Sequence, residues 1–340
     1  MTELLKRLVD AGGISGNEAE IRAVINKEIL KYVDETSVDS VGNLIAHKKG
    51  KGSKVMLAAH TDEVGLMVKG TDDEGNVYFS RIGGIEPLTL IGQRVKIKSS
   101  YNHFVDGVIT TKEISNSDFV TKLPEASDLF IDTGHTKEEL EKKGVNPGDF
   151  IVLYQEFGYL KDGDLVYGKA LDDRVGCYIL IELAKKLQKT EADIYYVFTV
   201  QEEIGLYGAK ISAYKIQPNW AIAVDATGAE DKASIKMNVI GKGPAITLKD
   251  SGMITNSTIN GWLAETAKKH KIPLQYDVNE KGSTDALSIS FTREGVPSTI
   301  VGIPIRNLHS TIGIASMNDI NNAIKLLFEL LHAPPKLSVV

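Results

Sequence analysis

The chain of 340 residues is predicted to fold as an α/β protein with a mainly parallel central sheet flanked by helices. Two observations lead to this prediction. Strand-like and helix-like segments alternate along much of the chain, which is typical of a parallel sheet covered by helices. Between residues 63 and 164 the segments instead become short, β-like and rich in glycine. The simplest arrangement is one α/β domain, residues 1–62 plus 165–340, interrupted by a small β-rich domain at 63–164.

Apolar residues at helical spacing predict five helices. Two of them start at a capping box, in which the side chains of the first residue and of a residue three positions later satisfy free backbone N–H groups. These boxes are Thr136 with Glu139, and Ser316 with Asp319. In chain order, the expected helices are 17–33, 137–143, 175–187, 255–269 and 317–331.

Short apolar runs bounded by turn residues predict the strands. Those of the central sheet are expected at 43–47, 55–59, 195–200, 221–224 and 297–302. Those of the β-rich domain are expected at 77–80, 94–98, 104–109, 129–131 and 150–153.

Composition excludes several classes of function. The net charge of −6 argues against a nucleic-acid partner, which needs a surface rich in lysine and arginine. The single cysteine, Cys177, cannot form an intramolecular disulfide, rules out a cysteine-rich zinc site, and is expected to be a small buried residue. No secretory signal and no apolar stretch of about 18 residues is evident, so we expect no membrane association and a soluble, cytoplasmic protein.

Two acidic pairs lie beside apolar segments, where adjacent carboxylates are unfavourable unless a positive charge compensates them. These are Asp172-Asp173 and Glu202-Glu203. Taken singly, such pairs are more often helix caps or solvated surface. Further polar residues, however, follow the predicted strands at their carboxyl ends, where open α/β sheets bind ligands. These further residues are His60, Asp62, Asp225 and His309.

Histidines and carboxylates without thiolates suit zinc, cobalt or manganese. Two such divalent ions joined by a shared carboxylate would offset the negative charge and activate a water molecule. A neighbouring carboxylate that binds no ion could then act as general base. Glu202 and Glu203 could divide these two functions between them.

Five segments together resemble one family, the TET-type dinuclear metalloaminopeptidases of the glutamyl/leucyl aminopeptidase group, some of whose members are labelled endoglucanases. The matching segments are AAHTDEVG, YGKALDDRVG, TVQEEIGLYGA, AVDAT and RNLHS. They occur in the order found in the family, and the resemblance covers essentially the whole chain. It implies a zinc-peptidase-like catalytic domain and a barrel or PDZ-like insertion.

The resemblance also implies roles for individual residues. Asp172 would bridge two metal ions, with His60 and Asp225 completing one site and Glu203 and His309 the other. Glu202 would be the general base that takes a proton from the attacking water and passes it to the leaving amine. Asp62 would orient His60, and Asp173 would support Asp172 through a peptide bond that is often cis. Asp285, within GSTDAL, matches a motif near the active site and is a candidate for substrate binding.

The expected activity is therefore metal-dependent removal of N-terminal residues from short peptides. By resemblance, the inserted domain would pair subunits into dimers, and the dimers would form a tetrahedral dodecamer. Two alternatives stay open at this point. One is an endoglucanase-type glycosidase, which needs two carboxylates but has no use for the histidines. The other is a metal-stabilised peptide-binding protein without catalysis. The preferred N-terminal residue and the metal are also open.

Overall fold

The computed structural model describes residues 2–101, 103–120, 122–231 and 237–335, and its largest element is a sheet of 11 strands. Nine strands follow one another across this sheet: β1 (Glu35–Val38), β2 (Leu44–Lys48), β12 (Asp193–Thr199), β3 (Lys54–His60), β13 (Trp220–Gly228), β16 (Ser298–Arg306), β17 (Gly313–Ser316), β11 (Leu165–Gly168) and β10 (Gly158–Leu160). The other two are β14 (Ala245–Lys249), which pairs with β16, and β15 (Gln275–Val278), which pairs with β14.

Only the centre of the nine-strand path is parallel. β12 pairs in parallel with β3, β3 with β13, and β13 with β16. Towards both edges the pairing becomes antiparallel, as between β2 and β12 and between β16 and β17. The expected mainly parallel sheet is thus correct for the centre, and the sheet as a whole is mixed. Its edge strand β1 is largely exposed, so it lacks the apolar run by which the sequence reveals a strand.

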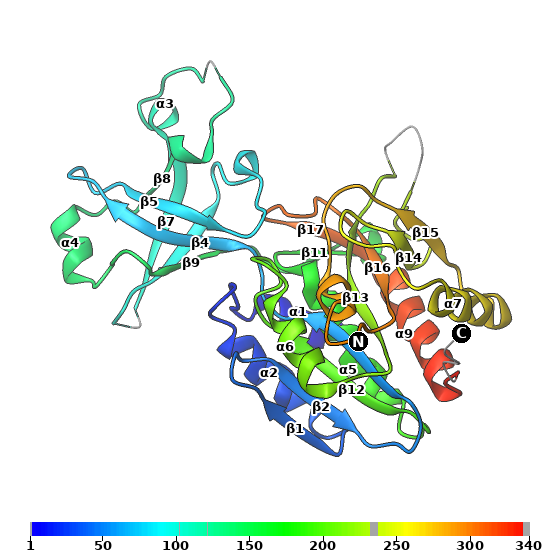
Figure 1. Cartoon of the computed structure of the whole chain (residues 1–340). Coiled ribbons are helices and arrows are strands. Elements are labelled where there is room, and N and C mark those ends of the chain that lie inside the picture. Colours follow the sequence, from blue (N-terminus) through cyan, green and yellow to red (C-terminus); the bar gives the residue numbers. More distant parts are fainter. Residues whose placement is uncertain (1, 102, 121, 232–236, 336–340) are drawn as a thin grey trace.

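Six further strands close into a barrel between residues 65 and 153. In order around the barrel they are β4 (Gly65–Thr71), β5 (Val77–Ile82), β8 (Leu129–Asp132), β7 (Phe104–Thr111), β6 (Arg94–Lys98) and β9 (Phe150–Leu153). The barrel has a hydrophobic core of its own and stands beside the α/β body (Figure 1). Two short helices, α3 (Lys112–Ser115) and α4 (Lys137–Lys142), belong to the same part of the chain.

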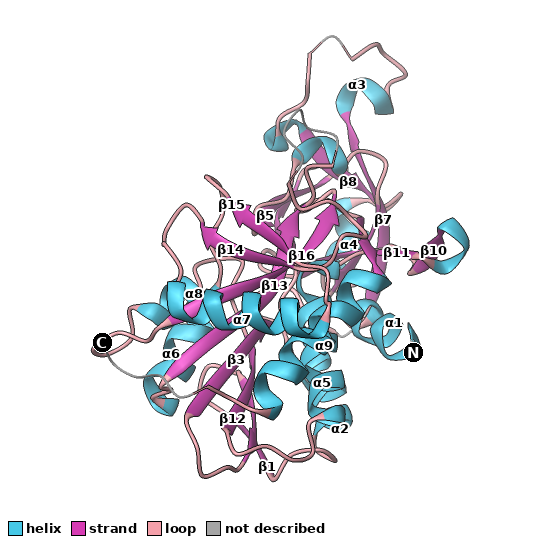
Figure 2. Ribbon diagram, turned by 90° about the vertical axis from the view of Figure 1, so that its right-hand side faces the viewer, coloured by secondary structure: helices cyan, strands magenta, loops and turns pink. Residues whose placement is uncertain are grey.

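Helices cover both faces of the main sheet. Buried residues of one group of helices share a core with the central strands: α1 (Thr2–Asp10), α2 (Ala19–Ile29), α5 (Leu171–Lys186), α7 (Ser257–His270) and α9 (Met317–His332). The opposite face packs against α6 (Tyr207–Ile216) and α8 (Asp285–Ser290). Figure 2 shows α6 and α8 on one side of the strands and α5 and α9 on the other. In the part of the chain described, no helix is long and apolar enough to cross a membrane.

Observed helix ends depart from the predicted ones where side chains make tertiary contacts. α2 is shorter at both ends than the predicted 17–33, and just before its start Glu18 is buried and accepts hydrogen bonds from the backbone N–H groups of Gly16 and Gln201. α5 begins at Leu171 rather than at residue 175. The sequence pattern also does not predict α1, α6 and α8, of which α8 has only 6 residues.

One predicted capping box is confirmed and the other is wrong. Thr136 and Glu139 form the expected reciprocal hydrogen bonds at the start of α4. At the start of α9, Ser316 accepts a hydrogen bond from the N–H of Asn318. Asp319 does not complete that box, because its carboxylate accepts hydrogen bonds from the backbone of a distant loop, at Gly241 and Gly243.

Candidate metal centre

Side-chain alternation along the central strands directs two polar residues to the same face of the sheet. On β3, Leu57 and Ala59 pack in the core on the α5 side, so His60 projects towards α6 and α8. On β13, Val224 packs in the same core, so Asp225 projects to the opposite face together with His60. Both lie towards the carboxyl ends of parallel strands, as predicted, and open α/β sheets bind ligands at these ends.

The imidazole of His60 is buried among carboxylates. Its Nδ1 lies 3.0 Å from the backbone oxygen of Asp62, and because a carbonyl only accepts, Nδ1 carries the hydrogen. Its Nε2 faces Asp172 Oδ1 at 3.0 Å and Asp225 Oδ1 at 3.6 Å. Since carboxylate oxygens also only accept, Nε2 needs a positive partner between itself and them, either a proton or a metal ion.

The acidic pair Asp172-Asp173 opens α5 with a non-helical backbone and a cis peptide bond between the two residues, as the resemblance implied. Its two members have different surroundings. The side chain of Asp172 is 17% exposed and faces the imidazole rings of His60 and His309. Asp173 is fully buried and accepts hydrogen bonds from the backbone N–H groups of His60 and Gly176. Asp173 therefore ties the start of α5 to the end of β3.

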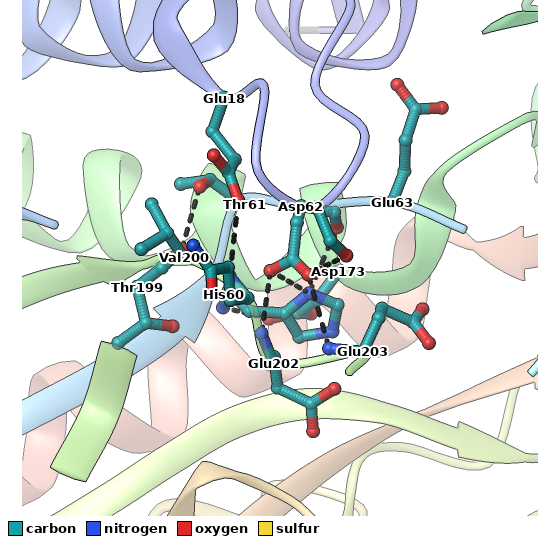
Figure 3. A network of polar contacts seen from close by, with 12 residues as sticks. Glu18, His60, Thr61, Asp62, Glu63, Asp173, Thr199, Val200, Glu202 and Glu203 are labelled. Carbon is teal, nitrogen blue, oxygen red and sulfur yellow. Dashed lines mark hydrogen bonds and ion pairs between the residues drawn. The ribbon is translucent and has the colours of Figure 1, made fainter. Parts of the chain in front are cut away.

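The Glu202-Glu203 pair occupies the loop after β12, and Asp62 holds that loop in place. The Asp62 carboxylate accepts hydrogen bonds from the backbone N–H groups of Glu202 at 3.1 Å and Glu203 at 3.2 Å, and from Ser15 Oγ at 2.6 Å. It lies 3.6 Å from His60 Nδ1, farther than the Asp62 carbonyl. Figure 3 shows both glutamates extending from this anchored backbone beside the His60 ring. Asp62 thus orients His60 by its backbone and the glutamates by its side chain.

Burial dominates the electrostatics of the centre. Burial raises the pKa of Glu202 well above its ordinary value, and the charge of His60 lowers it only in part. Burial and the negative charge of Asp172 likewise raise the pKa of Glu203. For His60, burial alone would lower the pKa, but the charge of Glu202 and the hydrogen bond to Asp172 raise it well above the usual value. The carboxylates therefore carry more negative charge than the surrounding side chains offset.

Three groups of donor atoms could hold metal ions, and within each group the atoms lie within 4.8 Å of one another. No described lysine or arginine forms an ion pair with any of these residues; among those described, His60 pairs with Asp172 and Asp225, and His309 pairs with Asp172. Imidazole nitrogen and carboxylate oxygen donors suit zinc, cobalt or manganese. The groups are His60 with Glu202 and Asp225, His60 with Asp172 and Glu203, and Asp172 with Asp173 and Asp225.

Two of the predicted residues lie at the margin of these groups. His309 follows β16, has a side chain 45% exposed, and approaches Asp172 Oδ2 to 3.6 Å with its Nε2. Asp285 is buried at the start of α8, where its Oδ2 accepts a hydrogen bond from Thr199 Oγ1 at 2.5 Å. Burial raises the pKa of Asp285 to about 7. Asp285 therefore lies behind the end of β12 and does not line the cavity described next.

A cavity of about 350 Å³ extends from the donor groups along the ends of β13, β14 and β15. No sequence pattern identifies the residues of its far wall. The alternation along β15 does indicate that Asp277 points inward, because the residues on either side of it are exposed. A strand of four residues, however, gives too short a pattern to be recognised from the sequence. Far-wall residues include Thr227, Thr247, Asp250, Asp277 and Ser283.

A family model described as M42 glutamyl aminopeptidase matches residues 42–326. The chain belongs to this M42 family. A putative aminopeptidase of Acetivibrio thermocellus is 45% identical to this M42 protein over 331 residues, which cover 97% of the chain and 98% of the relative. The lysyl aminopeptidase of Pyrococcus furiosus is 36% identical over 338 residues, which cover 97% and 96%. These findings confirm the resemblance, and the M42 protein is an aminopeptidase.

Solved structures share the fold of this M42 aminopeptidase. An aminopeptidase from the archaeon Desulfurococcus kamchatkensis superimposes with a TM-score of 0.92 at 36% identity, over 97% of this chain and 94% of that one. The Pyrococcus horikoshii TET1 peptidase, which can assemble into a tetrahedron or a large octahedral shell, gives 0.87 at 33%, over 97% and 98%. A Thermotoga maritima protein named endoglucanase gives 0.78 at 32%, over 96% of each chain.

Proposed function

We propose that this M42 aminopeptidase removes N-terminal residues from short peptides with the help of two divalent ions, zinc or cobalt, with manganese as a further candidate. Asp172 would contribute to both ion sites, His60 and Asp225 would complete one of them, and Glu203 and His309 would complete the other. The observation that carries the proposal is the buried Nε2 of His60, which faces carboxylate oxygens of two aspartates at 3.0 and 3.6 Å. A divalent ion between these donors would satisfy all of them at once.

In this proposal the two glutamates have different roles. Ions held by these residues would supply Lewis-acid polarisation of the scissile carbonyl and of the attacking water. Glu202 accepts the proton from that water and transfers it to the leaving amine. Its burial and raised pKa suit a group that must bind and release a proton. The hydrogen bonds from the backbone of Glu202 and Glu203 to Asp62 keep both carboxylates oriented during the transfer.

Glu202→Gln tests the general base. This variant is expected to bind two ions per subunit, as wild type does, yet to lose turnover of aminoacyl-aminomethylcoumarin substrates by about 100- to 10,000-fold. The matched variant Glu203→Gln should lose metal as well as activity, because it removes a proposed ligand. Ions are counted by mass spectrometry after desalting. Near-normal turnover in Glu202→Gln would refute the assignment.

The endoglucanase name of a similar structure supports one rival function, a glycosidase that uses two of the carboxylates. Such an enzyme has no role for His60 or His309. Hydrolysis of soluble cellulose that survives exhaustive chelation would favour it over the peptidase. The third possibility is a peptide-binding protein without catalysis, in which the ions stabilise the fold and their removal should unfold the protein. The proposed enzyme should instead lose activity at chelator concentrations that leave the fold intact.

We further propose that residues 63–164 form a dimerisation domain and that six dimers assemble into a tetrahedral dodecamer. Exposed apolar side chains on this segment support a protein interface, since Phe119 is 92% and Leu123 75% exposed. The tetrahedron that the Pyrococcus horikoshii TET1 peptidase can form supports the tetrahedral arrangement. Light scattering should give a mass near twelve times 37.0 kDa, and a monomer at micromolar concentration would contradict the proposal.

The names of similar proteins leave the preferred N-terminal residue undecided. The family model is described as a glutamyl aminopeptidase, whereas one relative is named a lysyl aminopeptidase. These side chains carry opposite charges, so the cavity of this chain must supply the answer.

A further inference from the structure

A carboxylate that no described lysine, arginine or histidine neutralises lies at the far end of the cavity. Asp277 on β15 lines the cavity together with the donor residues of the metal centre and is only 2% exposed. No lysine, arginine or histidine of the described ranges lies within ion-pair distance of it. A buried carboxylate is unfavourable unless a partner compensates its charge. This one lines a space that a substrate could enter.

The hydrogen bonds of Asp277 leave it free to accept another donor. Its Oδ2 accepts from Thr227 Oγ1 at 3.0 Å and Thr247 Oγ1 at 3.4 Å. Asn238 Nδ2 donates to Thr227 Oγ1, which leaves the Thr227 hydroxyl hydrogen directed at Asp277. The other oxygen, Oδ1, has no hydrogen-bond partner among the described residues. Two neutral hydroxyls thus fix the carboxylate in position without neutralising it.

The sheet sets the distance between this carboxylate and the metal centre. Asp225 and Thr227 are two positions apart on β13, so they project to the same face about 7 Å apart. Asp277 pairs by register with Thr247 on β14, and its Oδ2 lies 3.0 Å from the hydroxyl of Thr227. A peptide whose first carbonyl lies at the metal centre would therefore direct its first side chain towards Asp277. The four-carbon stem of lysine suits such a span.

We propose that Asp277 selects peptides whose N-terminal residue is basic, lysine or arginine, by accepting a charge-assisted hydrogen bond from its cationic end. The proposal rests on the aminopeptidase function proposed above. The aliphatic part of the substrate side chain lies along Ala226 and Ile300, which also line the cavity. Thr227 and Thr247 act as positioning residues for the carboxylate.

Outside the metal centre, two other charged residues among those described line the same cavity, and they make different predictions. Asp250 is held by its own turn, since its Oδ1 accepts hydrogen bonds from the backbone N–H groups of Gly252 and Met253. It adds negative potential, but its role is explained by the turn. Lys281 is exposed, and it is the only lysine or arginine among the described residues of the lining. If Lys281 governed selection, the enzyme would prefer N-terminal glutamate.

Three substrates separate these outcomes: lysyl-, norleucyl- and glutamyl-aminomethylcoumarin. Norleucine has the aliphatic chain of lysine without its ammonium group, so the lysine-to-norleucine ratio of kcat/KM isolates the charge. We expect a ratio of about 10 to 100 in the ion-loaded wild-type enzyme. Asp277→Asn should lower that ratio to near one, mainly through a lower kcat/KM for the lysyl substrate. Lys281→Met should raise the ratio or leave it unchanged.

Asp193→Asn is the matched control, because Asp193 begins β12 at the opposite end of the sheet, where it contacts His47. It should leave the ratio unchanged. A wild-type ratio near one overturns the proposal even if Asp277→Asn does not fold. A preference for glutamate that disappears in Lys281→Met also overturns it. Norleucine turnover without a lysine preference refutes only the selectivity, whereas absence of turnover on all three substrates refutes the aminopeptidase function itself.

Discussion

Replacing Asp285 by asparagine is expected to stabilise the ion-free protein at pH 8. Burial raises the pKa of this carboxyl from 3.8 to about 7, and at about 1.4 kcal/mol per pKa unit its ionisation costs the folded state about 4 kcal/mol relative to the unfolded chain. Asparagine is neutral at every pH, so it avoids this cost. It weakens the hydrogen bond from Thr199, which is worth about 1 kcal/mol. The net gain at pH 8 is about 3 kcal/mol.

The sign of the pH dependence follows from the raised pKa of Asp285. A carboxyl with a raised folded-state pKa contributes its full stability below its unfolded pKa and loses it as the pH rises through its folded pKa. At pH 5 the folded carboxyl is still protonated, and the wild type is disfavoured only by the interval of about 1.2 pH units above the unfolded-state pKa of 3.8. The gain in stability from Asp285→Asn therefore falls below about 1 kcal/mol.

Urea unfolding with chelator present, at pH 5 and pH 8, measures both values. Thr199→Val is the control, because it removes the hydroxyl partner and keeps the charge, and it should not stabilise at either pH. An effect of Asp285→Asn that is equal at both pH values would refute the reasoning.

Three further perturbations test the centre and its support. Chelation should lower the melting temperature more at pH 8 than at pH 5. At pH 5, below their raised pKa values, Glu202 and Glu203 take up protons, and these protons compensate for the lost cations. Equal losses at the two pH values would contradict this. Glu63→Gln should lower the free energy of unfolding in urea by about 3–5 kcal/mol, since it leaves the buried Lys169 without its ion pair. The control Lys161→Met removes an exposed ion pair and should change the free energy of unfolding by less than about 1 kcal/mol. In Gly176→Ala the new Cβ would clash with the Asp173 carboxylate and displace it. Calorimetry should then show a metal affinity at least about tenfold weaker than that of the wild type. An unchanged affinity would mean that Asp173 does not support the centre.

Strand-end polar residues could be predicted because each follows an apolar run that is itself recognisable. His60 and Asp225 were found in this way, and the sheet brings them to one face as alternation requires. Residues whose neighbours come from distant segments could not be placed. Asp319 resembles a capping residue in sequence, yet it binds the loop at Gly241 and Gly243, and no local pattern contains that contact.

For the same reason, the residue pattern does not assign roles within the acidic pairs, and only the family resemblance implied them. Sequence alone does not distinguish Asp172 from Asp173, because both follow Leu171 at the start of a helix. Folding buries Asp173 against the backbone of His60 and leaves Asp172 partly exposed towards two imidazole rings. Tertiary packing, which differs between adjacent residues, makes them chemically unequal.

By itself, the sequence determined the α/β class, the β-rich insertion, the family and the candidate donor residues, because apolar periodicity and short motifs are local properties of the chain. Only the tertiary structure decided that the sheet is antiparallel at its edges, that the Asp62 side chain holds the glutamate loop, and that Asp277 contacts Thr227. Each of these depends on contacts between segments far apart in sequence. The free energy of such contacts comes from burial and hydrogen bonding, which no single segment encodes.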